Sequence, residues 1–156
     1  MPTYKAPLRD VRFLLNEVFD YSSHYAGLAN GKDADADTVN AILEECARFC
    51  EETLAPLYWA KGDEACVLKD GQVTTPAGFK EAYAEYIAGG WQGLSHPTEY
   101  GGQGLPMSLG LLKSEMTGTA NWPFTMYPGL SLGCMNTIMQ YATPEQNALY
   151  MPALTE

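Results

Sequence analysis

Apolar residues recur at helical spacing through most of the chain. Between residues 8 and 19 they lie three or four positions apart, and the same spacing runs from Val39 to Leu54. Asp37 is expected to cap the second of these helices by accepting the free N–H groups of its first turn. Pro56 is expected to kink or end it near Leu54, because proline has no N–H to donate.

Two segments depart from this spacing. Residues 29–37 are acidic and rich in turn-forming residues, which predicts a linker. Residues 66–75 hold an Asp-Gly pair between two short β-prone stretches, which predicts a small hairpin or an extended loop. Neither segment is long enough to change the fold class.

Helical spacing returns after Pro76. We expect a helix that begins at Pro76 and is stopped by two glycines, and then a glycine-rich loop over 89–106. Further helices are expected over about 107–118, 129–141 and 144–154. The fold class is therefore all-α: a bundle of about six helices with a minor extended segment.

Charge is scarce and unevenly placed. Charged residues make up 18% of the chain, against roughly 25% for an average soluble domain. The 29 residues from Met116 to Pro144 contain no Asp, Glu, Lys, Arg or His. A solvated helix without charge is unusual. We expect this segment to be buried on most sides, in a core, at an interface or along an apolar ligand cavity.

The composition excludes several classes of protein. A net charge of −10 with scattered cations argues against binding to nucleic acid or to anionic membranes. No apolar run reaches the length of a membrane span and the N-terminus does not resemble a signal peptide, so the expected location is cytoplasmic. The four cysteines are expected to be reduced, packed thiols, and no metal site is expected.

Three motifs resemble functional sites, but for each of them the sequence favours a structural role. Asp33, Asp35, Asp37 and Glu44 match part of a calcium-loop template, but the glycine it requires is missing, so a solvated linker is preferred. The glycines of residues 101–104 match neither phosphate-loop template. His96 lies near Glu99 without a nucleophile, which favours a loop histidine with a structural hydrogen bond.

The second half of the chain resembles the N-terminal domain of the flavin-dependent acyl-CoA dehydrogenases. The resemblance rests on Gly90-Trp91-Gln92-Gly93-Leu94, on Pro97-Thr98-Glu99-Tyr100-Gly101-Gly102-Gln103-Gly104, on Ser114-Glu115-Met116, and on Tyr141 to Gln146 followed by Tyr150 to Leu154. Residues 4–17 look like the extra segment of a larger bacterial branch that includes the 3-(methylthio)propanoyl-CoA dehydrogenases. The expected division is therefore an extension helix and acidic linker over 1–35 and the family domain over 36–156.

The resemblance implies an enzyme that oxidises an acyl-CoA at Cα–Cβ and passes a hydride to FAD. In the family the catalytic glutamate and most of the flavin site lie in a middle β-domain and a C-terminal helical domain, which would follow Glu156. We therefore expect no catalytic residue in this chain, no flavin bound to it and no activity from it alone. The implied partners of the parent are the acyl-CoA, the remaining domains, a further copy of itself and an electron-transfer flavoprotein.

The resemblance also implies which residues form a wall of the acyl cavity. By position they are Tyr127, Pro128, Gly129 and Leu132. The sequence also allows these four residues to serve only as helix-start and core residues. It does not identify the acyl group that is oxidised. The alternative function is a helical protein-interaction or acyl-chain-binding module with no enzymatic parent. A reading frame that continues past Glu156 into a β-rich segment would favour the enzyme.

Overall fold

The computed structural model describes residues 3–61 and 64–155 and is mostly helical. This confirms the expected fold class. The helices are α1 (Leu8–Phe13), α2 (Tyr21–Ala26), α3 (Ala36–Phe49), α4 (Ala55–Lys61), α5 (Phe79–Ala88), α6 (Met107–Ala120), α7 (Trp122–Tyr141) and α8 (Pro144–Thr155). Two π-helical segments, η1 (Leu14–Val18) and η2 (Cys50–Leu54), continue α1 and α3, and a 3₁₀ turn, η3 (Thr98–Tyr100), lies in the glycine-rich loop.

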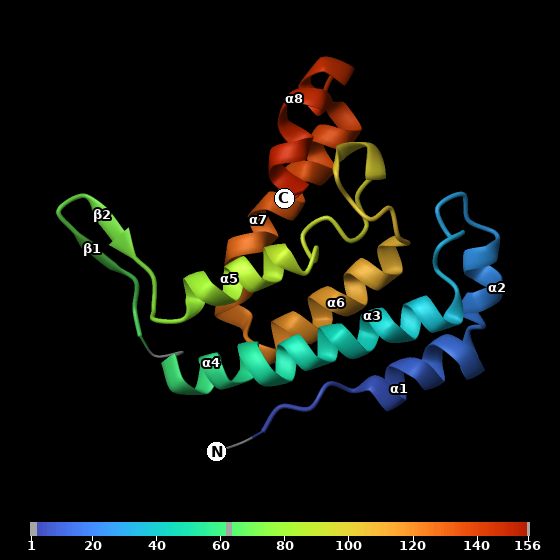
Figure 1. Cartoon of the computed structure of the whole chain (residues 1–156), viewed down its shortest axis with the longest axis horizontal. Coiled ribbons are helices and arrows are strands. Elements are labelled where there is room, and N and C mark those ends of the chain that lie inside the picture. The colour runs from blue at the N-terminus through green and yellow to red at the C-terminus, as the bar shows by residue number, and fades with distance from the viewer. Residues whose placement is uncertain (1–2, 62–63, 156) are drawn as a thin grey trace.

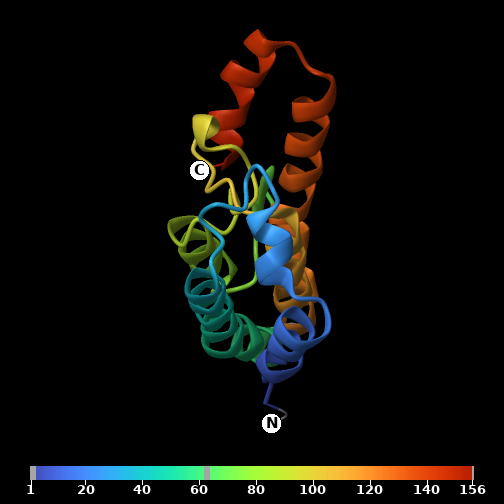
Figure 2. The ribbon, with the colours of Figure 1, turned by 90° about the vertical axis from the view of Figure 1, so that its right-hand side faces the viewer.

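The helices form two parts that share α7 (Figure 1). At the base, α3, η2 and α4 make one long helix, and α6 packs along it. Helix α7 leaves the end of α6 and rises away from the base, and α8 folds back along its upper half (Figure 2). The end of α8 then packs against η3, which ties the projecting pair of helices to the glycine-rich loop.

The long helix differs from the expectation at both ends. Its cap is Asp35 and not Asp37, because the Asp35 carboxylate accepts hydrogen bonds of 3.0 Å from the N–H groups of Asp37 and Thr38. Pro56 does not end the helix, since α4 continues through it. The α-helical hydrogen bonding instead widens to a π turn over the five residues before α4.

The hairpin over residues 66–75 is confirmed. Strands β1 (Val67–Lys69) and β2 (Gln72–Thr74) pair antiparallel, with Val67 opposite Thr74. Asp70 and Gly71 both have positive φ, which is the backbone of a type I′ turn. All six strand residues are exposed, so the hairpin adds no core.

Three helix starts were wrong or missed. Helix α5 begins at Phe79, three residues after Pro76, with Gly78 as its cap. Helix α7 begins at Trp122, because the Asn121 side chain accepts a hydrogen bond from the N–H of Phe124. Helix α2 was not expected; it starts after Asp20, whose carboxylate accepts from the N–H of Ser23.

Phe124 is the centre of the aromatic core. Its side chain is fully buried. The centroid of its ring lies 6.3 Å from the ring centroid of Phe49, 6.4 Å from that of Phe79 and 5.8 Å from that of Tyr86. Just before it, the buried Asn121 side chain donates a 3.0 Å hydrogen bond to the carbonyl of Leu54. The start of α7 is therefore fixed against both the long helix and α5.

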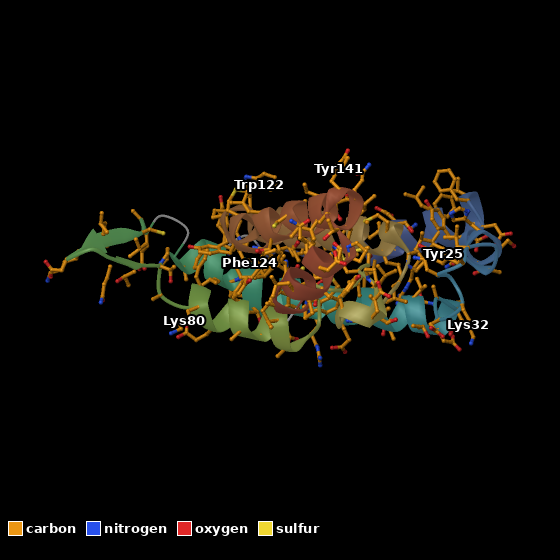
Figure 3. All side chains as sticks on the ribbon, turned by 90° about the horizontal axis from the view of Figure 1, so that it is seen from above. Tyr25, Lys32, Lys80, Trp122, Phe124 and Tyr141 are labelled. Atoms are coloured by element: carbon orange, nitrogen blue, oxygen red, sulfur yellow. The ribbon has the colours of Figure 1, made fainter. Side chains whose placement is uncertain are left out.

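The charge-free segment is not buried on most sides within the described residues. Trp122 is 66% exposed, Leu130 82% and Tyr141 76%, whereas Phe124 is buried. Figure 3 shows Trp122 and Tyr141 at the same outer edge, with Phe124 turned inward. The core explanation therefore fails for this face of α7, and an interface or a ligand cavity remains.

Candidate functional site

A groove runs between α6 and α7 and has two neighbouring parts that share lining residues. The larger part, of about 210 Å³, is lined from Tyr86 and α6 to the first half of α7. The smaller part, of about 130 Å³, extends to the glycine-rich loop at residues 91–96. Lys113, Ser114 and Leu132 line both parts, and we call the whole feature the α6–α7 groove.

Three of the four predicted acyl-cavity residues line this groove. Pro128, Gly129 and Leu132 face its larger part. Tyr127 lies outside it and turns to the other side of α7, where its ring is 5.8 Å from that of Phe79 and its hydroxyl is 3.7 Å from the Cys66 sulfur. The difference follows from helix geometry, because adjacent residues lie about 100° apart around an α-helix.

The backbone of α7 keeps the groove open at Pro128 and Gly129. Pro128 is buried inside the helix, and its carbonyl accepts a 3.5 Å hydrogen bond from the Gln92 amide. A Cβ placed on Gly129 would have no heavy atom within 4 Å. The groove therefore has free space beside Gly129 that a substrate group or a larger side chain could fill.

Lys113 forms the polar floor of the groove. It is only 4% exposed, and its ammonium donates a 2.8 Å hydrogen bond to the Tyr86 hydroxyl. Burial lowers the pKa of Lys113 to about 8, and the nearby thiol of Cys46 opposes that shift. A buried ammonium is expensive unless it is paired. No carboxylate among the described residues forms an ion pair with it.

Tyr86 links the Lys113 ammonium to the backbone of the core through a second hydrogen bond. Its hydroxyl donates in turn to the carbonyl of Trp91 over 3.4 Å. Burial raises the pKa of this phenol well above its ordinary value, so it stays protonated. Tyr86 therefore positions the Lys113 ammonium and does not supply a negative charge to it.

No disulfide joins the four cysteines, and only two of them are packed. Cys46 and Cys50 are buried on the long helix. A hydrogen bond between their sulfurs lowers the pKa of Cys46 and raises that of Cys50. Cys66 and Cys134 are exposed, so the expectation of packing was wrong for them.

The smaller part of the groove contains buried polar atoms without partners. His96 is 5% exposed, and its ring interacts with the Asn136 side chain, but neither ring nitrogen forms a well-aligned hydrogen bond among the described residues. Burial lowers the pKa of His96, which favours the neutral ring. The Gln92 side-chain oxygen is also buried and unpaired. These atoms can accept or donate hydrogen bonds to a molecule in the groove.

The glycine-rich loop does not fit a phosphate or a dinucleotide cofactor. The N–H groups of Gly102, Gln103 and Gly104 already donate to carbonyls of the same loop, over 3.1, 2.9 and 2.8 Å. A Cβ on Gly102 would lie 2.2 Å from the carbonyl oxygen of His96, which shows that close packing requires this glycine. No Lys or Arg occurs between residues 89 and 106. The structural interpretation of the loop is confirmed.

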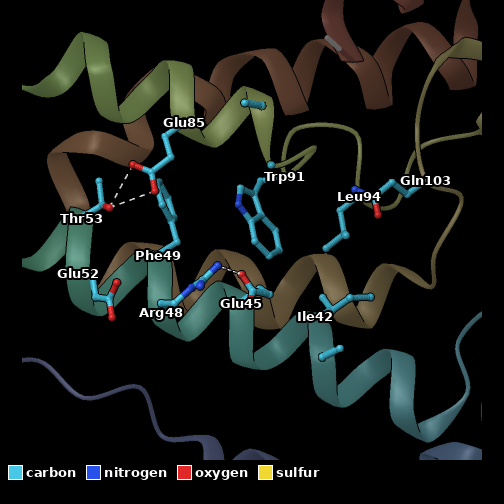
Figure 4. Close-up of a pocket in the computed structure, with 13 residues that line it drawn as sticks. Ile42, Glu45, Arg48, Phe49, Glu52, Thr53, Glu85, Trp91, Leu94 and Gln103 are labelled. Atoms are coloured by element: carbon cyan, nitrogen blue, oxygen red, sulfur yellow. Dashed lines mark hydrogen bonds and ion pairs between the residues drawn. The ribbon is translucent and has the colours of Figure 1, made fainter.

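A second and larger pocket, of about 620 Å³, lies between the long helix and α5 (Figure 4). Phe49 and Trp91 form its apolar part, and Arg48 pairs with Glu45 at its rim. Thr53 donates a 3.2 Å hydrogen bond to the Glu85 carboxylate across it. None of the predicted site residues lines this pocket, and it contains no buried unpaired polar atom.

Neither a metal site nor a membrane-spanning helix is found in residues 3–61 and 64–155. In that part of the chain, no group of three His, Cys, Asp or Glu side chains is placed to hold a metal ion. In the same residues, every helix is too short or too polar to cross a bilayer. Asp35 of the calcium-like pattern is the cap of α3.

Sequence reasoning missed Lys113, Tyr86 and Gln92 as groove residues. A signal for Lys113 was present, because Leu109, Lys113 and Met116 fall at helical spacing and all three are buried. A lysine in the middle of an apolar stripe indicates either a snorkelling surface residue or a buried charge. The structure shows the buried charge.

Comparisons with known proteins agree on one family. A family model described as "Acyl-CoA dehydrogenase, N-terminal domain" matches residues 36–156. The chain is 36% identical over 152 residues to a 3-methylmercaptopropionyl-CoA dehydrogenase of Ruegeria pomeroyi, which covers 97% of this chain and 26% of that protein. It is 30% identical over 112 residues to the acyl-CoA dehydrogenase FadE26 of Mycobacterium tuberculosis, over 71% of this chain and 27% of that protein. The chain thus spans about a quarter of these relatives.

Proposed function

This chain belongs to the acyl-CoA dehydrogenase family, and we propose that it is the N-terminal helical domain of an enzyme that oxidises an acyl-CoA to the enoyl-CoA. Within that enzyme it forms one wall of the acyl cavity. The proposal rests on family membership for the reaction class. It rests on the groove between α6 and α7 for the role of this domain.

One observation is the main support for the proposed role of this domain as a wall of the acyl cavity. The start of α7 combines an exposed apolar face with a groove of about 210 Å³ that Pro128, Gly129 and Leu132 line. An apolar helix face of this kind needs a cover in water. An acyl chain and the domains that hold its CoA would cover it, and the absence of charge from residue 116 to residue 144 suits that environment.

The proposed cofactor is FAD, held by parts of the enzyme outside this domain. In the glycine-rich loop the N–H groups of residues 100–105 are already hydrogen-bonded and there is no Lys or Arg, so the described residues do not fit a flavin nucleotide on their own. Glu99 and Glu115 are exposed and neither lines the α6–α7 groove, so neither is proposed as the base. The proposed acceptor of the electrons is an electron-transfer flavoprotein, and the proposed enzyme is a homo-oligomer in the cytoplasm.

The test uses the polypeptide that the gene encodes at its natural length. It is expected to purify with flavin absorbance and to reduce an artificial electron acceptor when an acyl-CoA is added. The 156-residue chain alone is expected to do neither. A natural-length protein that folds without flavin and oxidises none of a series of acyl-CoAs would contradict the proposal and favour the interaction-module alternative.

A further inference from the structure

Lys113 is a buried cation at the floor of the α6–α7 groove, and no carboxylate in residues 3–61 and 64–155 pairs with it. Its side chain lines both parts of the groove and is 4% exposed. The 2.8 Å hydrogen bond to the Tyr86 hydroxyl uses one of its three N–H donors. Tyr86 lines the larger part of the groove as well, so the ammonium end of the side chain lies on that side.

The groups around the ammonium do not neutralise it. Tyr86 is a protonated phenol, and its ring lies 5.3 Å from the ammonium. The Cys46 thiol interacts electrostatically with Lys113 from the long helix, but it accepts a hydrogen bond from Cys50 and lines neither part of the groove. A buried charge of this kind is normally paired or bound to a ligand.

An independent observation points to a polar ligand in the adjoining part of the same groove. In the smaller part of the groove, the side-chain oxygen of Gln92 is buried without a hydrogen-bond partner, and the buried ring nitrogens of His96 interact with the Asn136 side chain without a well-formed hydrogen bond. Buried polar groups nearly always have a partner in the functional state. The interior end of the groove is therefore built for a group that forms hydrogen bonds, and not for a methyl group.

The hydroxyl groups along the groove do not change this conclusion. Ser114 and Thr117 donate to carbonyls of their own helix, at 2.8 and 3.2 Å, and Thr125 donates to the carbonyl of Trp122 at 2.7 Å. Their protons are already used, so they offer lone pairs to the groove. The Lys113 ammonium remains as the charged donor that faces it.

We propose that the acyl group accepted by this groove ends in a carboxylate, which pairs with the Lys113 ammonium. The inference rests on the proposed function and names the substrate class for the same site. The groove volume of about 210 Å³ is below the roughly 300–1,000 Å³ of pockets that hold drug-sized ligands, which suits a short chain. The substrate class is therefore the CoA thioester of a short dicarboxylic acid.

The test compares CoA thioesters of equal length with and without the carboxylate: glutaryl-CoA against pentanoyl-CoA, and adipyl-CoA against hexanoyl-CoA. The natural-length enzyme is expected to prefer the carboxylate member of each pair by at least about tenfold in kcat/KM, as for a hydrogen bond to a charged group. Lys113→Met is expected to reduce that preference about tenfold or more. Lys113→Arg is expected to retain part of it.

Lys80→Met is the matched control, because Lys80 is an exposed lysine on α5 that lines neither part of the groove. A wild-type preference for the methyl-ended thioesters would overturn the inference while the proposed function stands. The same holds for a carboxylate preference that Lys113→Met leaves unchanged, since Lys113 would then serve only the core. If the Lys113 variants do not fold, the wild-type ratios decide. A flavin-bearing enzyme that oxidises neither member of either pair nor any longer acyl-CoA would overturn the proposed function itself.

Discussion

The ammonium of Lys113 donates a 2.8 Å hydrogen bond to the hydroxyl of Tyr86, from α6 to α5 through the interior of the bundle. The bond links two helices that also border the α6–α7 groove. Tyr86 passes the interaction to the carbonyl of Trp91 at the start of the glycine-rich loop. The position of the charge in the groove therefore depends on a single phenol.

Tyr86→Phe is expected to destabilise the protein. The variant keeps the ring but leaves a buried ammonium without its acceptor, which costs about 1–3 kcal/mol in free energy of unfolding. Urea unfolding followed by circular dichroism measures it. Tyr83→Phe is the control, because Tyr83 stacks on Tyr86 but its hydroxyl forms no hydrogen bond with the described residues, so its loss should cost little. Equal losses in the two variants would contradict the role given to the hydroxyl.

The stability of the protein is expected to rise with pH through the titration of Lys113. The pKa of about 8 in the folded state lies below the ordinary 10.5, so the folded state releases this proton first. Below pH 8 both states hold the proton and the full penalty of the buried ammonium applies. Between pH 8 and pH 10.5 the unfolded state binds more protons, and the free energy of unfolding therefore increases.

Lys113→Met isolates this effect from other groups. The difference in free energy of unfolding, wild type minus variant, is expected to rise by about 2 kcal/mol between about pH 7 and pH 9.5. That window stays below the ordinary titration of tyrosine near 10. The raised pKa of Cys50 acts in the opposite direction, but its main causes, the Cys46 hydrogen bond and burial, are shared by both proteins. A difference that stays constant with pH would show that Lys113 is not buried as a charge.

Asn121→Ala is expected to be among the more damaging single substitutions outside the groove. The Asn121 side chain caps α7 through the N–H of Phe124 and donates to the carbonyl of Leu54, and both bonds are 3.0 Å long and buried. Loss of both is expected to lower the free energy of unfolding by about 2–3 kcal/mol. Asn30→Ala is the control, because Asn30 is exposed. A loss below about 0.5 kcal/mol would contradict the predicted importance of this cap.

Thiol reactivity is expected to divide the cysteines into two pairs. Cys66 and Cys134 are exposed and should react at once with Ellman's reagent in the native protein. Cys46 and Cys50 are 1% and 0% exposed and should react only as fast as the protein opens. Cys66→Ser should remove half of the fast phase. Four fast thiols in a protein that circular dichroism shows to be folded would contradict the burial of the pair.

The sequence predicted the helices whose apolar stripe coincides with an evident cap or stop. Helix α8 begins at Pro144 and α6 begins at Met107, as expected. The start of α7 was placed seven residues late, because the cap at Asn121 was not recognised. Tertiary packing of Phe124 against rings of other helices stabilises the turns of α7 that precede Pro128.

The candidate site could be predicted from the sequence only in part. Family resemblance led to Pro128, Gly129 and Leu132, but without the helix start it could not show that Tyr127 faces the opposite side. Lys113 was not predicted, because local spacing does not reveal whether a lysine in an apolar stripe reaches water. Its burial depends on α3 and α5, which are remote in sequence.

Gly129→Leu is expected to fill the larger part of the α6–α7 groove without disturbing the fold. A Cβ at this position meets nothing within 4 Å, and leucine in place of glycine favours the helix by up to about 1 kcal/mol. In the natural-length enzyme, the variant should lower kcat/KM for five- and six-carbon thioesters about tenfold or more, and that for propanoyl-CoA much less. Gly133→Leu is the matched control: it lies one turn along α7, has the same free space and lines neither part of the groove. If the two variants lost activity equally, or if Gly129→Leu lost none, the acyl chain would not occupy the space beside Gly129, and the wall assigned to Pro128, Gly129 and Leu132 would be wrong.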